Sequence, residues 1–315
     1  MKVPTGRARW VAAAHLLSIA LLGAVPRDVR AEVAADLDGP LIEKLTGAKG
    51  QLARGEGVFK VSVPRTDLKV TVAGSPVVPA QGLISWAAFS GSDLDARVMG
   101  DLVLTEDQVN PVMSVALESG LEVTALHNHF FWDSPRVMFM HIGGMGSVPT
   151  LATAVGRILE KIRATSGGKG EVLTARVDPA GTTLDPARIE AILRVKGASG
   201  GGVYKVVVGR STSMDGMAAG NAMGVNTWAS FAGSDDRAVV DGDFAVLESE
   251  LQPVLKALRG AGIDIVAIHQ HMTGESPRIL FLHYWGVGST AALARGLRAA
   301  LDQTAAAPGA RKAQN

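Results

Sequence analysis

Histidine is the residue type whose spacing in this sequence could support chemistry. The 315-residue chain has 7 histidines and no cysteine. Neutral imidazoles are good ligands for Zn²⁺ and Cu²⁺, and without thiolates a metal site here would use nitrogen and oxygen ligands. Six of the histidines form two sets with the same internal spacing: His127, His129 and His141, then His269, His271 and His283. The sequence therefore predicts one or two three-histidine sites for a divalent transition metal, with Zn or Cu favoured.

A β-hairpin would bring each third histidine to the first two. Side chains alternate along a strand, so His127 and His129 share a face. If the hairpin is symmetric about Ser134, His141 lies opposite His127 and Phe139 lies opposite His129, with Cβ atoms of opposite residues about 4.5–5.5 Å apart. The same arithmetic applies to the second set. A slip of one residue would move His141 to the other face, and a metal-free polar network of buried histidines is the simpler alternative.

Other residues that occur in both halves could assist the histidines. Arg136 and Arg278 follow Ser-Pro in the hairpin connections and are candidates to bind a small anionic substrate beside the metal. Ordinary turn chemistry also explains Ser-Pro, and it explains the Gly-Ser-Asp segments. The candidate carboxylate partners, two in each half, are Asp93, Asp101, Asp235 and Asp243.

The histidine sets recur because the chain contains a duplication. Trp86-Ala-Ala-Phe-Ser-Gly-Ser-Asp93 recurs as Trp228-Ala-Ser-Phe-Ala-Gly-Ser-Asp235, and both histidine sets keep the same offset of 142 residues. This period is too long for a solenoid repeat. The predicted organisation is a signal peptide at 1–31, repeat 1 at 36–165, a Gly-rich linker at 166–182, repeat 2 at 183–302 and a disordered tail at 303–315.

Each repeat is predicted to fold as α+β. Alternating and helical patterns in the first repeat indicate the order β-α-β-β-α, which favours a mixed or antiparallel sheet with helices packed on it. Thr105 is a candidate N-cap of the first of these helices, and Gly120 follows its end. The predicted ranges are strands at 98–104, 122–129 and 136–141 and helices at 105–119 and 148–162.

The N-terminus has the pattern of a secretory signal peptide. Basic residues precede an apolar run from Trp10 to Val25, and Val29-Arg30-Ala31 offers small residues for cleavage. The run is shorter than the roughly 20 residues that a membrane span needs, so we favour cleavage over a retained anchor. We expect a periplasmic or secreted protein without a membrane span. The net charge of +1 gives no electrostatic case for nucleic-acid binding.

Three segments carry a resemblance to a known family. The segments are Trp86–Asp93, Gly100-Asp-Leu-Val-Leu-Thr-Glu106 and Ala125-Leu-His-Asn-His-Phe130, and together they resemble the LppY/LpqO-like family. Its members are exported bacterial proteins, some of them lipoproteins, classed as a domain of unknown function. The resemblance covers nearly the whole chain after the signal, in both copies, and implies export without implying an activity. The absence of cysteine departs from the lipoprotein members, because lipid attachment needs that residue.

These features favour an exported metal-binding protein and leave its biological role open. One alternative is a metal-dependent hydrolase or oxidoreductase, in which bound water is the nucleophile and Asp101 or Asp243 is the general base. A second is a metal-free two-histidine phosphodiesterase, although the usual His-x-Ser/Thr of such enzymes stands here as His-x-His. A third is a metal-free binding module.

Overall fold

The first repeat is built from helices and antiparallel strands. The computed structural model describes residues 37–306, so the predicted signal peptide (1–31) lies outside it. The helices of the first repeat are α1 (Gly39–Thr46), η1 (Pro79–Gln81), α2 (Glu106–Glu118) and α3 (Val148–Ala164). Its strands are β1 (Gly50–Ala53), β2 (Val58–Pro64), β3 (Thr71–Val72), β4 (Ser75–Pro76), β5 (Ile84–Gly91), β6 (Ala96–Thr105), β7 (Glu122–His127), β8 (Asp133–Ser134) and β9 (Val137–Gly146).

The second repeat follows the same order of main elements. Its helices are α4 (Pro186–Leu193), η3 (Asn221–Met223), α5 (Glu248–Gly260) and α6 (Thr290–Leu301), and η2 (Pro179–Gly181) precedes them. Its strands are β10 (Gly197–Gly200), β11 (Val203–Gly209), β12 (Thr212–Met214), β13 (Met217–Ala219), β14 (Asn226–Gly233), β15 (Ala238–Leu247), β16 (Asp264–His269) and β17 (Ile279–Gly288).

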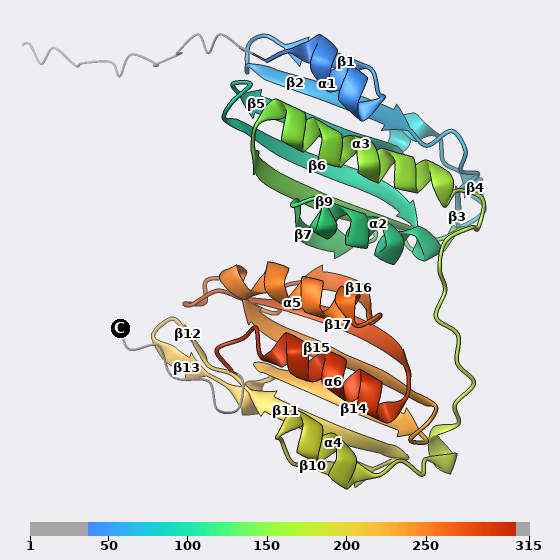
Figure 1. The fold of residues 1–315 in the computed structure, drawn as a ribbon, viewed down its shortest axis with the longest axis vertical. Coiled ribbons are helices and arrows are strands. Elements are labelled where there is room, and N and C mark those ends of the chain that lie inside the picture. The colour runs from blue at the N-terminus through green and yellow to red at the C-terminus, as the bar shows by residue number, and fades with distance from the viewer. Residues whose placement is uncertain (1–36, 307–315) are drawn as a thin grey trace, which may run out of the picture. The chain divides into compact units, whose positions relative to one another are not determined.

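The main strands of both repeats form one sheet of 12 strands in the order β1-β2-β5-β6-β9-β7-β16-β17-β15-β14-β11-β10. Every pair of neighbouring strands in it is antiparallel, and β7 pairs with β16 at Leu126 and Ile268. The helices cover one face of the strands of each repeat (Figure 1). Burial alternates along β5 and β6, with the helix-facing residues buried. The α+β prediction is confirmed, and the two predicted sheets are continuous with each other.

Local sequence explains where α2 begins. The side chain of Gln108 accepts a hydrogen bond from the backbone N–H of Thr105 at 3.1 Å, and Glu106 and Asp107 lie in the first turn. This capping arrangement satisfies a free donor, and the acidic side chains suit the positive end of the helix dipole. The strand β6 therefore ends at Thr105, and α2 starts at the next residue, Glu106, with Thr105 at the predicted N-cap position.

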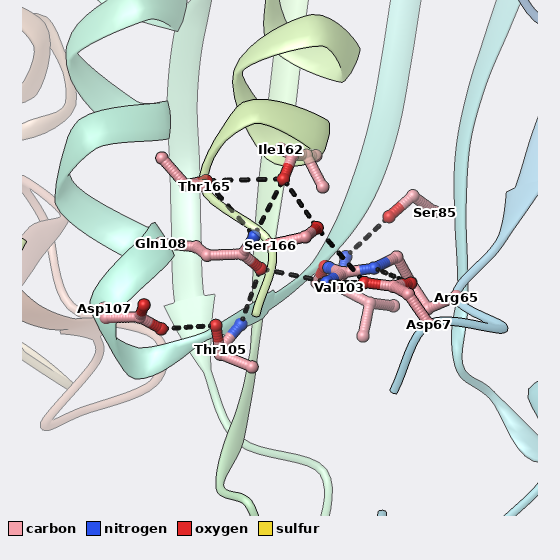
Figure 2. Close-up of polar contacts among 10 residues, drawn as sticks. All are labelled: Arg65, Asp67, Ser85, Val103, Thr105, Asp107, Gln108, Ile162, Thr165 and Ser166. Carbon is pink, nitrogen blue, oxygen red and sulfur yellow. Dashed lines mark hydrogen bonds and ion pairs between the residues drawn. The ribbon is translucent and has the colours of Figure 1, made fainter. Parts of the chain in front are cut away.

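A buried arginine ties the start of α2 to the sheet. Arg65, just after β2, is 2% exposed and donates to the carbonyl of Val103 and, at 3.0 Å, to Oε1 of Gln108 (Figure 2). Asp67 binds the same guanidinium at 2.9 Å. The second repeat repeats this arrangement with Arg210, which donates to Ala245 O and to Glu250. A buried charge needs such partners because its desolvation is costly.

Side-chain amides hold the two repeats together. Asn110 on α2 donates to Ile265 O at 3.1 Å and accepts from Ile265 N at 2.8 Å. Gln252 on α5 makes the matching pair with Val123, accepting from its N at 3.0 Å and donating to its O at 2.8 Å. Each amide therefore satisfies the backbone of the central strand that belongs to the other repeat.

The ends of the repeats differ slightly from the predicted boundaries. Residues 303–306 of the predicted tail are a turn, in which Thr304 is 5% exposed and Ala305 N donates to Glu250 at 2.8 Å. Residues 307–315 lie outside the described part of the chain. In the predicted linker, Gly170 N donates to Asp107 at 2.9 Å, so this segment passes the start of α2.

Candidate functional site

The sheet brings one carboxylate and one histidine of each repeat side by side. Asp101 on β6 is the direct partner of His141 on β9, and Asp243 on β15 is the direct partner of His283 on β17. The other two histidines of each set lie at the end of the next strand or just beyond it. The result is a cluster of three histidines and one aspartate in each repeat.

Both clusters lie on the face of the sheet opposite the helices. Leu126 and Ile268, the paired residues of β7 and β16, are buried in the core beneath the helices. The next residue of each strand, His127 or His269, therefore points to the other face. The two clusters share that face because a single sheet carries both.

The predicted hairpin register was wrong by two residues. His127 pairs with Phe139, and His141 pairs with Ala125 across a bulge after Val123. The second repeat has the same shift. The connection is not symmetric about Ser134, because β7 ends at His127 and the chain then forms the separate short strand β8. A shift of two keeps the side-chain parity, so the histidines still share a face.

In the first cluster the closest pair is His127 and His141, whose Nε2 atoms are 3.0 Å apart. His141 Nε2 lies 4.0 Å from Asp101 Oδ1. His129 stacks on Phe139 with ring centroids 3.3 Å apart, which fixes the plane of its imidazole. Burial and the neighbouring His127 lower the pKa of His129, and a neutral imidazole is the form that binds a metal.

In the second cluster the closest pair is His269 and His271, whose Nε2 atoms are 3.1 Å apart. His271 Nε2 lies 3.5 Å from Asp243 Oδ2, and one ligand atom from each of these three residues lies within 4.8 Å of the others. His271 stacks on Phe281 at 3.4 Å, as His129 does on Phe139. His283 Nδ1 lies 3.2 Å from the carbonyl oxygen of Gly242 and can donate a hydrogen bond to it. Nε2 is then the nitrogen of His283 that could bind a metal.

Burial perturbs the ionisation of the second cluster. Asp243 is 2% exposed, and this burial raises the pKa of its carboxyl to about 6, although the nearby His283 opposes the shift. Burial and the neighbouring histidines lower the pKa values of His269 and His271. Within residues 37–306, Oδ1 of Asp101 and of Asp243 is buried without a hydrogen-bond partner. Such an atom has lone pairs available to a cation.

We expect Asp243→Asn to stabilise the metal-free protein at neutral pH. The pKa of Asp243 is higher in the folded chain than its ordinary 3.8, so folding stability falls as the pH rises from about 4 through 6, where the buried carboxyl ionises. At 1.36 kcal/mol per pKa unit the full penalty is about 3 kcal/mol, and the buried amide should recover about 1–2 kcal/mol of it.

This expectation is tested by urea unfolding in chelator at pH 4.5 and 7.5. The gain in the unfolding free energy should be present at pH 7.5 and absent at pH 4.5. The exposed Asp236→Asn is the matched control. A variant that is equally destabilised at both pH values would show that Asp243 makes stabilising hydrogen bonds instead.

Asp93 and Asp235, the other two candidate carboxylates, bind the backbone at the start of a helix. Oδ1 of Asp93 accepts from Asp38 N at 2.8 Å, and Oδ1 of Asp235 accepts from Asp185 N at 3.0 Å. Asp38 and Asp185 cap the first helix of each repeat. The structure thus places Asp93 and Asp235 in loop positions, as the turn interpretation of Gly-Ser-Asp expected.

Arg136 and Arg278 are exposed and face carboxylates. Arg136 Nε lies 4.0 Å from Glu106, and Arg278 Nη1 lies 3.2 Å from Glu248. Exposed pairs of this kind contribute little stability. No described contact joins either arginine to a histidine cluster, so their role as anion ligands stays a prediction.

Two cation–aromatic pairs were not predicted, and both lie on the face of the sheet that carries the histidine clusters. Trp86 is the direct strand partner of Asp101, and the ammonium of Lys60 lies 4.1 Å from the centre of its ring. Lys205 lies 4.2 Å from Trp228 in the same way. The alternation in the two duplicated strand segments could have predicted the position of these lysines. Each lysine stands between two buried residues, so its side chain points to the face of the sheet opposite the helices.

Comparison with known proteins identifies the family. The family described as "Domain of Unknown Function (DUF1259)" matches residues 41–161 and again residues 187–303. The chain belongs to this family and contains its domain twice, in agreement with the predicted duplication. Curated proteins gave no match.

A structural comparison gave a trimeric bacterial microcompartment shell protein, PduB. The match has 12% sequence identity and covers 79% of this chain and 87% of that chain, with a TM-score of 0.17. A score of this size carries no argument about fold or function. A search for membrane-spanning helices among residues 37–306 found none of sufficient length and hydrophobicity.

Proposed function

We propose that this protein binds a divalent transition metal in each repeat. The observation that carries the proposal is the cluster of Asp243, His269 and His271, whose ligand atoms lie within 4.8 Å of one another. Asp101 and His127, His129 and His141 occupy the corresponding positions of the first repeat, and His283 completes the second set. Three imidazoles and one carboxylate are a ligand set that Zn²⁺ and Cu²⁺ accept.

The distances support a metal site over a simple polar network. Two ligands that bind Zn²⁺ at about 2.0–2.1 Å in tetrahedral geometry are about 3.3 Å apart. The closest ligand atoms in the clusters are separated by 3.0, 3.1 and 3.5 Å. Hydrogen bonds between imidazoles would explain the contacts at 3.0 and 3.1 Å, but they leave the buried Oδ1 atoms of Asp101 and Asp243 without a partner.

Metal content of untagged protein tests the proposal. After incubation with Zn or Cu salts and desalting, we expect two metal equivalents per chain in the wild type and one in His269→Ala/His271→Ala. The matched variant, His127→Ala/His129→Ala, should also retain one equivalent, and the four-histidine variant none. A wild-type content near zero by inductively coupled plasma analysis would overturn the proposal.

Export is part of the same proposal. The signal-like segment at 1–31 and the likeness to LppY/LpqO proteins support a periplasmic or secreted location. N-terminal sequencing of the protein isolated from a periplasmic fraction tests this: cleavage near Ala31 is expected, and an intact Met1 in the cytoplasm would contradict it.

A metal-dependent hydrolase or oxidoreductase is the second candidate, because the clusters are accessible. The side chains of His141 and His271 are 36% and 37% exposed, so a small anionic substrate could reach a bound metal. Chelator-sensitive turnover on ester and phosphoester panels, lost in His127→Ala or His269→Ala, would favour this function. Turnover that ignores the chelator would favour a two-histidine phosphodiesterase.

A further inference from the structure

A cavity of about 620 Å³ lies beside the first hairpin, apart from the residues of the two clusters. Its wall includes the hairpin loop after His129, the start of α2, the linker segment at 171–173 and the first residues of β16. We infer that this cavity binds a small organic cation, such as a quaternary ammonium compound. The inference goes beyond the proposed metal binding and does not depend on it.

Aromatic side chains supply the apolar part of the wall. Phe131 and Trp132 line the cavity and are 73% and 78% exposed, with ring centroids 5.8 Å apart and planes tilted by 55°. Phe130 and Trp285 also line it. Large apolar side chains this exposed are costly in water and are a common sign of a binding surface. Tilted aromatic faces are the surfaces on which an organic cation is held.

The backbone at Trp132 adopts a conformation that disfavours a large residue. Trp132 has a φ of +59°, in the left-handed region. Gly274 is the residue 142 positions later, and it has a φ of +81°, which glycine adopts without strain. The preceding residue, Phe131, corresponds to Thr273. The aromatic pair therefore belongs to the first repeat alone, at a position where the shared fold is best served by glycine.

The charge of the wall selects for a cation. Four carboxylates line the cavity, those of Glu106, Asp107, Glu171 and Asp264, against one lining arginine, Arg136. Arg259 binds Asp264 from outside the wall. Two arginines therefore offset two of the four carboxylates, and the cavity remains negative. A neutral or anionic ligand would gain nothing from this field, whereas a cation gains from both the carboxylates and the ring faces.

Calorimetric titration with choline tests this inference in chelator-treated full-length protein. The controls are 3,3-dimethyl-1-butanol, which has nearly the same shape without the charge, and benzoate, which is an anion. We expect choline to bind at least about tenfold more tightly than the alcohol, and benzoate not to bind. Equal affinity for choline and the alcohol, a preference for benzoate, or no choline binding at 10 mM would overturn the inference.

Trp132→Gly is the decisive variant, because it installs the residue of the second repeat. It should lower choline affinity by about tenfold or more while leaving the melting temperature unchanged or higher. Glu171→Gln should lower choline affinity about threefold. Met217→Ala, which removes an exposed apolar side chain of the second repeat, should have no effect. Wild-type affinity in Trp132→Gly would overturn the assignment, and metal content is expected to stay the same in every variant.

Discussion

Replacing His271 with alanine is expected to weaken Zn²⁺ binding at the second-repeat site by more than about 100-fold. Loss of a residue that only supports a ligand costs about 10–100-fold in metal affinity, and His271 lies at the centre of the cluster. Its Nε2 is 3.1 Å from His269 and 3.5 Å from Asp243. Competition titration with a chromophoric chelator would measure the Zn²⁺ affinities of the first-repeat site and of the second-repeat site separately.

The same titration, repeated at several pH values, measures how the Zn²⁺ affinity of this site depends on pH. Burial raises the pKa of Asp243 to about 6 and lowers the pKa values of His269 and His271. Protonation of Asp243 therefore competes with the metal as the pH falls through about 6, and the affinity should fall below this pH. His129→Ala is the matched variant, expected to weaken only the first-repeat site. Unchanged affinity in His271→Ala would remove this residue from the ligand set.

Asn110 and Gln252, the two side-chain amides that bind the central strand of the other repeat, are called here the amide clamps. Removing both should destabilise the fold by about 3–5 kcal/mol. Asn110 satisfies both backbone groups of Ile265, and Gln252 satisfies both of Val123. An unsatisfied buried polar group costs about 1–3 kcal/mol. Asn110 is 8% exposed, so Asn110→Ala should account for the larger share, and Gln252→Ala is discounted because water reaches it more easily.

Urea unfolding of the two single variants and the double variant would measure these effects. The exposed Gln51→Ala controls for the loss of an amide that holds no strand of the other repeat. A two-step transition in the double variant would show that the clamps couple the repeats into one cooperative unit. A double variant within about 0.5 kcal/mol of the wild type would mean that the strand pairing alone holds the junction.

Much of each repeat was predictable because its signals are local. The capped start of α2 depends on residues within one helical turn, and the alternation that marks β2 depends on residues two apart. The hairpin register was not predictable, because the chain after β7 forms the separate short strand β8, which pairs with β3, and because β7 has a bulge after Val123 where it pairs with β9. The pairing of β3 with β8 joins segments far apart in the chain.

The sequence by itself determined the duplication, the two histidine sets and the common face of the first two histidines in each set. These properties depend on residue identity and on the two-residue period of a strand, which a shift of two leaves intact. Only the tertiary structure decided which carboxylates belong with the histidines. Asp93 and Asp101 are both candidate partners in the sequence, but strand pairing places Asp101 beside His141, and Asp93 instead accepts a hydrogen bond from Asp38 at the start of α1. The burial that raises the pKa of Asp243 likewise requires the packed fold, because desolvation depends on every neighbour and not on position in the chain.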